Sequence, residues 1–224
     1  MASSKIIGTT AWLDSAPGRY LLDWEQSRID RLVSDIFGFH ALQLGWPALQ
    51  GLRTNRMQHR WLLSPHGLPD AVLPLPEAPE GLPCGPLTGC VQADFEALPF
   101  PSESLDLVLL PHTLELAADP HQTLREVERV LRPEGRVIVL GFNPASAWGL
   151  RWQLDGLLRR CQLGQEFLPH EIEPIGWLRL RDWLRLMGLQ ITGGHFGCYR
   201  PPLRSEPWLE RCAWMEGAGQ RWWP

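Results

Sequence analysis

The sequence predicts an α/β fold in which a mostly parallel sheet is flanked by helices on both faces. Its middle alternates short apolar runs with a helical pattern: residues 88–93, 105–110 and 136–142 are typical of buried strands, and residues 120–131 of an amphipathic helix. Parallel neighbours need such long crossover connections. The length of 224 residues and the 44% hydrophobic content suit one domain, residues 1–224, with a sizeable core.

The N-terminal part predicts a helix over residues 22–37, after an irregular segment at 12–20. Apolar side chains recur there at helical spacing, and Gly38 is a plausible stop that closes the segment 22–38. The repeating apolar residues are Ile29, Leu32, Val33, Ile36 and Phe37. We expect this helix to pack on the sheet.

Two further strands are expected at residues 39–44 and 58–64, and Gly45 follows the first of them. The segment after the second strand, residues 65–87, contains seven prolines. Proline lacks the backbone N–H that a helix interior needs, so this density excludes a long helix there. The sequence therefore predicts an extended loop along the sheet edge.

The helix at 120–131 has a clear start, because Asp119 can cap it, Pro120 suits its first turn, and Gln122 completes a capping box. We expect residues 133–135, Pro-Glu-Gly, to end this helix and to turn the chain into the strand at 136–142.

The C-terminal part predicts a helix at residues 144–161, a second helix at 177–187 and a sixth strand at 189–199, interrupted by two glycines. A short helical segment follows at 206–216, and the sequence closes on Trp-Trp-Pro. No further strand is evident, so we expect the final antiparallel strand of such sheets to be missing or the C-terminus to be truncated.

Composition narrows the classes of function. The formal net charge is −4, which argues against general nucleic-acid binding. Residues 151–224 are mildly basic, with 10 arginines against 8 acidic residues. Five cysteines without paired spacing predict reduced thiols, no metal site and a cytoplasmic protein. The start lacks a signal-peptide pattern, and no window approaches the roughly 20 apolar residues of a membrane span.

Three segments resemble a known family: ADFEALPFPSESLDLVL, HTLEL and LREVERVLRPEGRVIV, all within residues 91–142. They are similar to the middle of class I S-adenosylmethionine-dependent methyltransferases, and more narrowly to the methyltransferase type 11 group. The resemblance implies a Rossmann-like sheet, S-adenosyl-L-methionine as cofactor, and a cofactor-binding core at residues 39–143. It also implies a lid and acceptor region at 144–187, followed by the last strand and tail at 188–224.

The resemblance places the cofactor at the carboxyl ends of the strands, where ligands of open α/β sheets bind. The residues implied are Leu44, Gly45, Trp46, Ser64, Asp94, Phe95, Glu96 and Pro111. Asp94 would accept a hydrogen bond from the adenine amino group, and Phe95 would pack on the ring. His112 would face the transferred methyl group as the candidate catalytic residue, acting either as a base or only to orient the acceptor. A purely structural histidine is the alternative.

The sequence also departs from the family. Trp46 and Pro47 replace the small residues usual after Gly45, Gln43 stands where a carboxylate is common, and Leu62 occupies the place of the acid that binds ribose. Losing that acid removes a contact of about 1.5–3 kcal/mol. We therefore expect methyl transfer to a small-molecule acceptor, with a catalytically inactive binding or scaffold protein, and thirdly an RNA methyltransferase, as alternatives. A tryptophan that filled the nucleoside hollow would argue against the enzyme.

Overall fold

The computed structural model describes residues 12–65, 87–160, 167–169 and 171–222. It divides into two compact units, residues 25–141 and residues 1–24 with 142–224. The first helix, α2 (Ala16–Val33), contributes to both units. The proline-rich segment predicted as an extended loop lies almost entirely outside the described residues.

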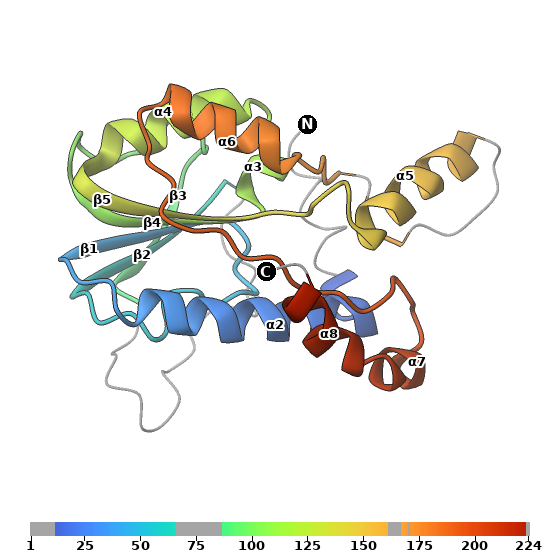
Figure 1. The fold of residues 1–224 in the computed structure, drawn as a ribbon. Coiled ribbons are helices and arrows are strands. Elements are labelled where there is room, and N and C mark those ends of the chain that lie inside the picture. Colours follow the sequence, from blue (N-terminus) through green and yellow to red (C-terminus); the bar gives the residue numbers. More distant parts are fainter. Residues whose placement is uncertain (1–11, 66–86, 161–166, 170, 223–224) are drawn as a thin grey trace. The chain divides into compact units, whose positions relative to one another are not determined.

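The unit of residues 25–141 is built on a five-stranded, wholly parallel sheet with strand order β3-β2-β1-β4-β5 (Figure 1). The strands are β1 (His40–Leu44), β2 (His59–Ser64), β3 (Gly89–Gln92), β4 (Leu105–Pro111) and β5 (Leu131–Leu140). The helices of this unit are α3 (Thr113–Leu116), α4 (Pro120–Val130) and the part of α2 from Glu25 onward. Helix α4 and this part of α2 lie on opposite faces of the sheet (Figure 1). The predicted Rossmann-like class is confirmed.

The core of this unit lies on both faces of the central strands. Leu42, Leu44, Leu107 and Leu109 are fully buried, as expected for parallel strands covered on both sides. Ile29 of α2 is likewise fully buried, together with Leu124 and Val127 of α4. The apolar runs of the sequence therefore became strands because only a doubly covered sheet removes them from water on both faces.

Two boundaries differ from the prediction. α2 begins at Ala16 and ends at Val33, so residues 16–20 are helical and not irregular. Gly38 does not stop it; a side chain there would collide with Asp106, because an added Cβ would lie 2.5 Å from that residue's Cβ. This glycine allows the chain to pass close to β4.

The predicted helix end at residues 133–135 is also wrong. α4 ends at Val130, and Leu131 already pairs with Leu105 as part of β5. A register shift between Leu105 and Leu107, and a positive φ of 66° at Glu134, accommodate the proline and glycine inside β5. The predicted start of α4 is confirmed, since the Asp119 side chain accepts hydrogen bonds from the backbone N–H groups of the first turn.

The unit of residues 1–24 and 142–224 contains α5 (Ala147–Arg160), α6 (Trp177–Leu186), α7 (Glu206–Arg211) and α8 (Trp214–Trp222). An aromatic cluster forms its core: Trp148 contacts Trp12, Phe142 and Phe167, with ring centroids 5.2–6.4 Å apart. In the described part of the chain, no helix is long and apolar enough to cross a membrane.

The sixth strand predicted at residues 189–199 does not form. The Glu216 side chain accepts hydrogen bonds from the backbone N–H groups of Cys198 and Tyr199 and from the Tyr20 hydroxyl. Those N–H groups are thereby satisfied without a neighbouring strand. The tail helix predicted at 206–216 is two helices, α7 and α8, that meet at Cys212.

Candidate functional site at the carboxyl ends of the strands

The loop after β1 opens the candidate site. Gly45 has a φ of +75°, and its N–H donates to the Leu63 carbonyl of β2 at 2.7 Å. A Cβ at Gly45 would lie 3.0 Å from the Phe95 ring and 3.8 Å from the Thr113 hydroxyl. The residues that follow β1, β3 and β4 thus converge on one glycine, whose missing side chain lets the Phe95 ring pack against the backbone.

The Gln43 side chain holds this loop through hydrogen bonds to its backbone. Its buried side-chain nitrogen donates to the carbonyls of Gly45, Trp46 and Leu49 at 2.8–3.2 Å, and its oxygen accepts from the Gly51 N–H at 3.0 Å. A carboxylate at this position could accept but not donate. The Gln43 side chain therefore fixes the backbone of the loop, and both its nitrogen and its oxygen are hydrogen-bonded within the protein.

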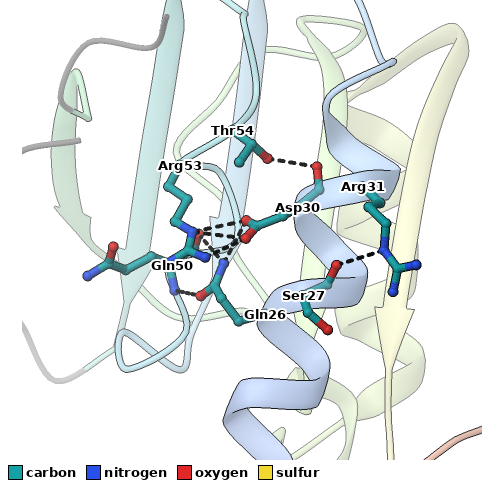
Figure 2. Close-up of polar contacts among 7 residues, drawn as sticks. All are labelled: Gln26, Ser27, Asp30, Arg31, Gln50, Arg53 and Thr54. Carbon is teal, nitrogen blue, oxygen red and sulfur yellow. Dashed lines mark hydrogen bonds and ion pairs between the residues drawn. The ribbon is translucent and has the colours of Figure 1, made fainter. Parts of the chain in front are cut away.

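Helix α2 is tied to the same loop (Figure 2). Gln26 exchanges two hydrogen bonds with the backbone of Gln50, both 3.0 Å long. One turn further along α2, the Asp30 carboxylate pairs with the Arg53 guanidinium. The backbone carbonyl of Asp30 accepts a hydrogen bond from the Thr54 hydroxyl. These contacts fix the position of α2 where Glu25 projects from it.

His112 occupies the end of β4 and is almost fully buried. Its backbone is left-handed, with a φ of 54°, and its N–H donates to the Leu140 carbonyl. Its ring nitrogen Nδ1 lies 2.7 Å from the Glu115 carboxylate, and Nε2 lies 2.8 Å from the Glu25 carboxylate. One imidazole is thus bracketed by two buried carboxylates.

This arrangement holds a proton on the imidazole. Burial alone would lower the pKa of His112, but the negative charge of Glu25 and the hydrogen bonds to Glu115 and Glu25 outweigh it and raise that pKa to about 9. Both ring nitrogens then act as donors at neutral pH. With both N–H groups bonded to these carboxylates, the protonated ring has no free lone pair with which to remove a proton, and it can act on another group only through Glu25 or Glu115.

Trp46 covers the imidazole. Its indole ring packs edge-on against His112, with the ring centroids 4.0 Å apart, and it is only 6% exposed. Its backbone has a φ of 42°, in the left-handed region that side chains other than glycine seldom adopt. A bulky residue held in this conformation is typical of functional sites.

The residues that the sequence implied for the adenine lie at the end of β3. Asp94 is exposed, whereas Phe95 is 8% exposed and its ring lies against Gly45. Glu96 has a different environment: its carboxylate accepts a hydrogen bond from the Asp119 backbone N–H at 2.7 Å. Glu96 thereby takes the role that the capping box assigned to Gln122, and it ties the β3 end to the start of α4.

The remaining implied residues contribute through the backbone or the core. Leu44 is fully buried, and its carbonyl accepts a hydrogen bond from the Thr113 hydroxyl. Ser64 and Pro111 are buried at the ends of β2 and β4. Leu62 is buried within β2, opposite Gln43, and supplies no polar atom.

The strand ends fit a nucleoside at its base and less well at its sugar. The exposed carboxylate at Asp94 and the aromatic ring at Phe95 are groups that suit adenine. The missing acid at Leu62 leaves the ribose to other contacts. In the described residues, no group of histidine, cysteine and acidic side chains has the arrangement of a metal site.

Three polar residues of the site escaped the sequence analysis: Glu25, Thr113 and Glu115. Glu115 lies three residues after His112, a spacing at which helical side chains can meet, and this was the available signal. Glu25 is 87 residues away from His112, so no local pattern links the two.

Known proteins resemble this chain in sequence and in fold. Residues 75–139 match the model of a family described as a methyltransferase domain. Over 187 residues the chain is 28% identical to the uncharacterised protein YafS of Escherichia coli K12, a match that covers 83% of this chain and 67% of YafS.

Two further similarities are informative. The ubiquinone/menaquinone biosynthesis C-methyltransferase UbiE of Hahella chejuensis is 53% identical over 53 residues, which are 24% of this chain and about a fifth (21%) of UbiE. A solved Haloferax volcanii methyltransferase, in complex with the Trm112 methyltransferase activator, superposes with a TM-score of 0.57 at 21% identity. That superposition covers 83% of this chain and 77% of the other, and it shows a shared fold.

Proposed function

We propose that this chain is a class I S-adenosylmethionine-dependent methyltransferase that transfers a methyl group from S-adenosylmethionine to a small-molecule acceptor, a proposal supported by the matched methyltransferase domain and the shared fold. The convergence of Gly45, Phe95 and Thr113 at the carboxyl ends of three strands is the observation that carries the proposal. When bound, the cofactor supplies a methyl group that its sulfonium has already activated. The chain then has to bind, orient and exclude water.

Each residue has a proposed role. Asp94 accepts a hydrogen bond from the adenine amino group, and Phe95 packs on the base. The backbone at Leu44, Gly45 and Trp46 approaches the cofactor, and Ser64 and Pro111 line the neighbouring strand ends. His112 is a cation that fixes the Glu25 carboxylate and so orients the acceptor through Glu25, a role supported by the carboxylates on both of its nitrogens.

A small acceptor is favoured over RNA. The side chains nearest His112, namely Glu25, Trp46 and Glu115, are all at least nine-tenths buried, and a buried site admits a small group more readily than a polynucleotide. The formal net charge of −4 also opposes RNA binding. We place the protein in the cytoplasm, a proposal supported by free thiols at Cys90 and Cys212.

A binding protein without turnover is the second candidate. The buried, apolar Leu62 at the place of the ribose acid favours it, because the cofactor loses a charged hydrogen-bond partner there. Trp46 also favours a binding protein without turnover, since its indole ring occupies space beside His112. The two candidates differ in whether S-adenosylmethionine binds and is consumed.

Calorimetric titration of the full chain with S-adenosylmethionine and S-adenosylhomocysteine tests the proposal. We expect binding of both, and Asp94→Ala should weaken it by roughly 10- to 150-fold, the value of a charged hydrogen bond. The unfolding free energy should not change, because Asp94 is exposed. The matched control is Asp35→Ala, an exposed carboxylate in the turn after α2. No heat at millimolar cofactor would refute the enzyme.

A further inference from the structure

We propose that Glu25 and Trp46 form a subsite for a hydroxyl group of the methyl acceptor, which donates to Glu25 Oε2 and accepts from Trp46 Nε1. The inference rests on the proposed function, since the hydroxyl belongs to the molecule that is methylated. Glu25 is 4% exposed and Trp46 6% exposed. Within the described part of the chain, neither Glu25 Oε2 nor Trp46 Nε1 has a hydrogen-bond partner.

Such atoms are uncommon in folded proteins. Leaving a buried polar group unsatisfied costs about 1–3 kcal/mol, and more for a charged group, so each case calls for an explanation. Of the buried side-chain atoms that lack a partner among the described residues, Glu25 Oε2 is the one acceptor; the others are nitrogens. A buried carboxylate oxygen without a donor is the strongest indication of a missing ligand group.

Both atoms belong to side chains that contact the same imidazole. Glu25 uses Oε1 to bind His112 Nε2 at 2.8 Å, and the Trp46 ring packs on His112 at 4.0 Å. The bond to His112 sets the orientation of the Glu25 carboxylate, so Oε2 is not free to turn toward another partner. The acceptor and the donor therefore flank one side chain at the carboxyl end of β4.

The pair selects the chemistry of its ligand. A hydroxyl group donates one hydrogen bond and accepts others, so it can satisfy both atoms at once. An ammonium group would leave the Trp46 N–H without an acceptor, and a carboxylate would be repelled by Glu25. We infer an alcohol or a phenol as the ligand.

The subsite is held rigidly. Glu25 lies on α2 directly before Gln26, and Gln26 and Asp30 tie that helix to the loop after β1 (Figure 2). The Trp46 carbonyl is fixed by the Gln43 side chain at 3.1 Å. Groups held in advance by such supporting contacts orient a ligand without a further loss of entropy.

Binding of phenol, compared with anisole, tests the inference. Anisole has the same ring but its oxygen carries a methyl group and cannot donate. The affinity of the full chain for each probe, with and without S-adenosylhomocysteine, is measured by ligand-observed NMR. We expect phenol to bind and anisole to bind at least roughly tenfold more weakly, since the charged hydrogen bond is lost.

Two variants separate the partners. Glu25→Gln keeps its bond to His112 through the amide oxygen and turns an NH₂ group toward the subsite, so phenol affinity should fall roughly tenfold or more. Trp46→Phe keeps an aromatic ring on His112 but removes the N–H, and should weaken phenol binding by about two- to tenfold. The matched controls are Glu128→Gln, exposed on α4, and Trp61→Phe on β2, and neither should change phenol binding.

Each result of these measurements either supports or overturns the proposed subsite. Equal affinity for the two probes, no phenol binding, or phenol affinity unchanged in both variants overturns the subsite. A crystal structure in which phenol fails to displace a water molecule between Glu25 and Trp46 overturns it as well. If Glu25→Gln does not fold, Trp46→Phe decides alone. Failure of S-adenosylhomocysteine to bind contradicts the proposed function, whereas the phenol measurements without it still test the subsite.

Discussion

The two ends of the parallel sheet use the same kinds of side chain in opposite ways. At the carboxyl end, His112 is buried between Glu25 and Glu115. At the amino end, His40 and His59 begin β1 and β2 and stack on each other with ring centroids 4.9 Å apart, both of them partly exposed. The carboxyl end buries its histidine, and the amino end leaves its two histidines partly in contact with water.

The carboxylates differ in the same way. Asp106, near the start of β4, accepts hydrogen bonds from the backbone N–H groups of Phe39 and His40 and pairs with Arg132. Burial raises its pKa, but these donors lower the net pKa below the ordinary value. Glu25, in contrast, keeps one buried oxygen without a partner in the described residues. The Asp106 carboxylate at the amino end therefore has its hydrogen-bond partners, whereas Glu25 at the carboxyl end has an oxygen that a ligand could bind.

The largest effect is expected from His112→Asn. Asparagine tolerates the left-handed backbone, but it removes the cation that lies between two buried carboxylates. Breaking a buried charge pair costs about 3–5 kcal/mol, and urea unfolding should show a loss of that size in the unfolding free energy. His40→Asn, at the amino end, should cost less than about 1 kcal/mol. Equal losses at both ends would remove the distinction between them.

The pH dependence of stability should run in opposite directions at the two ends. Because the folded-state pKa of His112 is about 9, above its unfolded value near 6.5, its contribution is complete below pH 6.5 and is lost as the pH rises through 9. The loss amounts to at most about 3 kcal/mol. Urea unfolding between pH 6 and 10 should show this decline in the wild type and not in His112→Asn.

At the amino end the sign reverses. Asp106 has a lowered pKa, so its contribution is present above the ordinary pKa of an aspartate and is lost as the pH falls below it. Asp106→Asn should therefore flatten the acid side of the stability curve and leave the alkaline side unchanged. An alkaline decline that survived in His112→Asn would assign it to another group.

A smaller effect is expected from Gln43→Glu. The substitution turns a donor into an acceptor that faces the carbonyls of Gly45, Trp46 and Leu49. With buried acceptors left unsatisfied, the unfolding free energy should fall by about 2–3 kcal/mol. Gln58→Glu, exposed immediately before β2, is the matched control and should be nearly neutral. A neutral Gln43→Glu would mean that the loop does not depend on these hydrogen bonds.

The smallest effect is expected from Asp30→Ala, which removes the pair with Arg53 shown in Figure 2. A partly exposed ion pair contributes about 1 kcal/mol or less, so stability should change little. Binding of the phenol probe should weaken, however, because α2 then holds Glu25 less firmly. Asp35→Ala is the control for both measurements. Unchanged phenol binding would show that Gln26 alone positions the helix.

Much of the fold was predictable, because its signals are local. Each strand overlaps a predicted apolar run, and Asp119 caps α4 as its neighbours in the sequence indicated. The errors arose where distant partners decide the outcome. Residues 189–199 have the composition of a strand, but Glu216 binds the N–H groups of Cys198 and Tyr199. Leu131 continues the helical periodicity of the preceding residues, but it pairs with Leu105 of β4 and is therefore the first residue of β5.

The sequence by itself determined the class of fold and the resemblance to methyltransferases, and it predicted the strand ends at which a cofactor would lie, because periodicity and short motifs are properties of neighbouring residues. It drew attention to His112 and Trp46 without revealing their surroundings. Only the tertiary structure decided that Glu25 meets His112, that Gln43 bonds to the loop after β1, and that Glu25 Oε2 and Trp46 Nε1 are buried without partners among the described residues. Burial and hydrogen bonding between residues far apart in the chain depend on how helices and strands pack, and no local pattern encodes that packing.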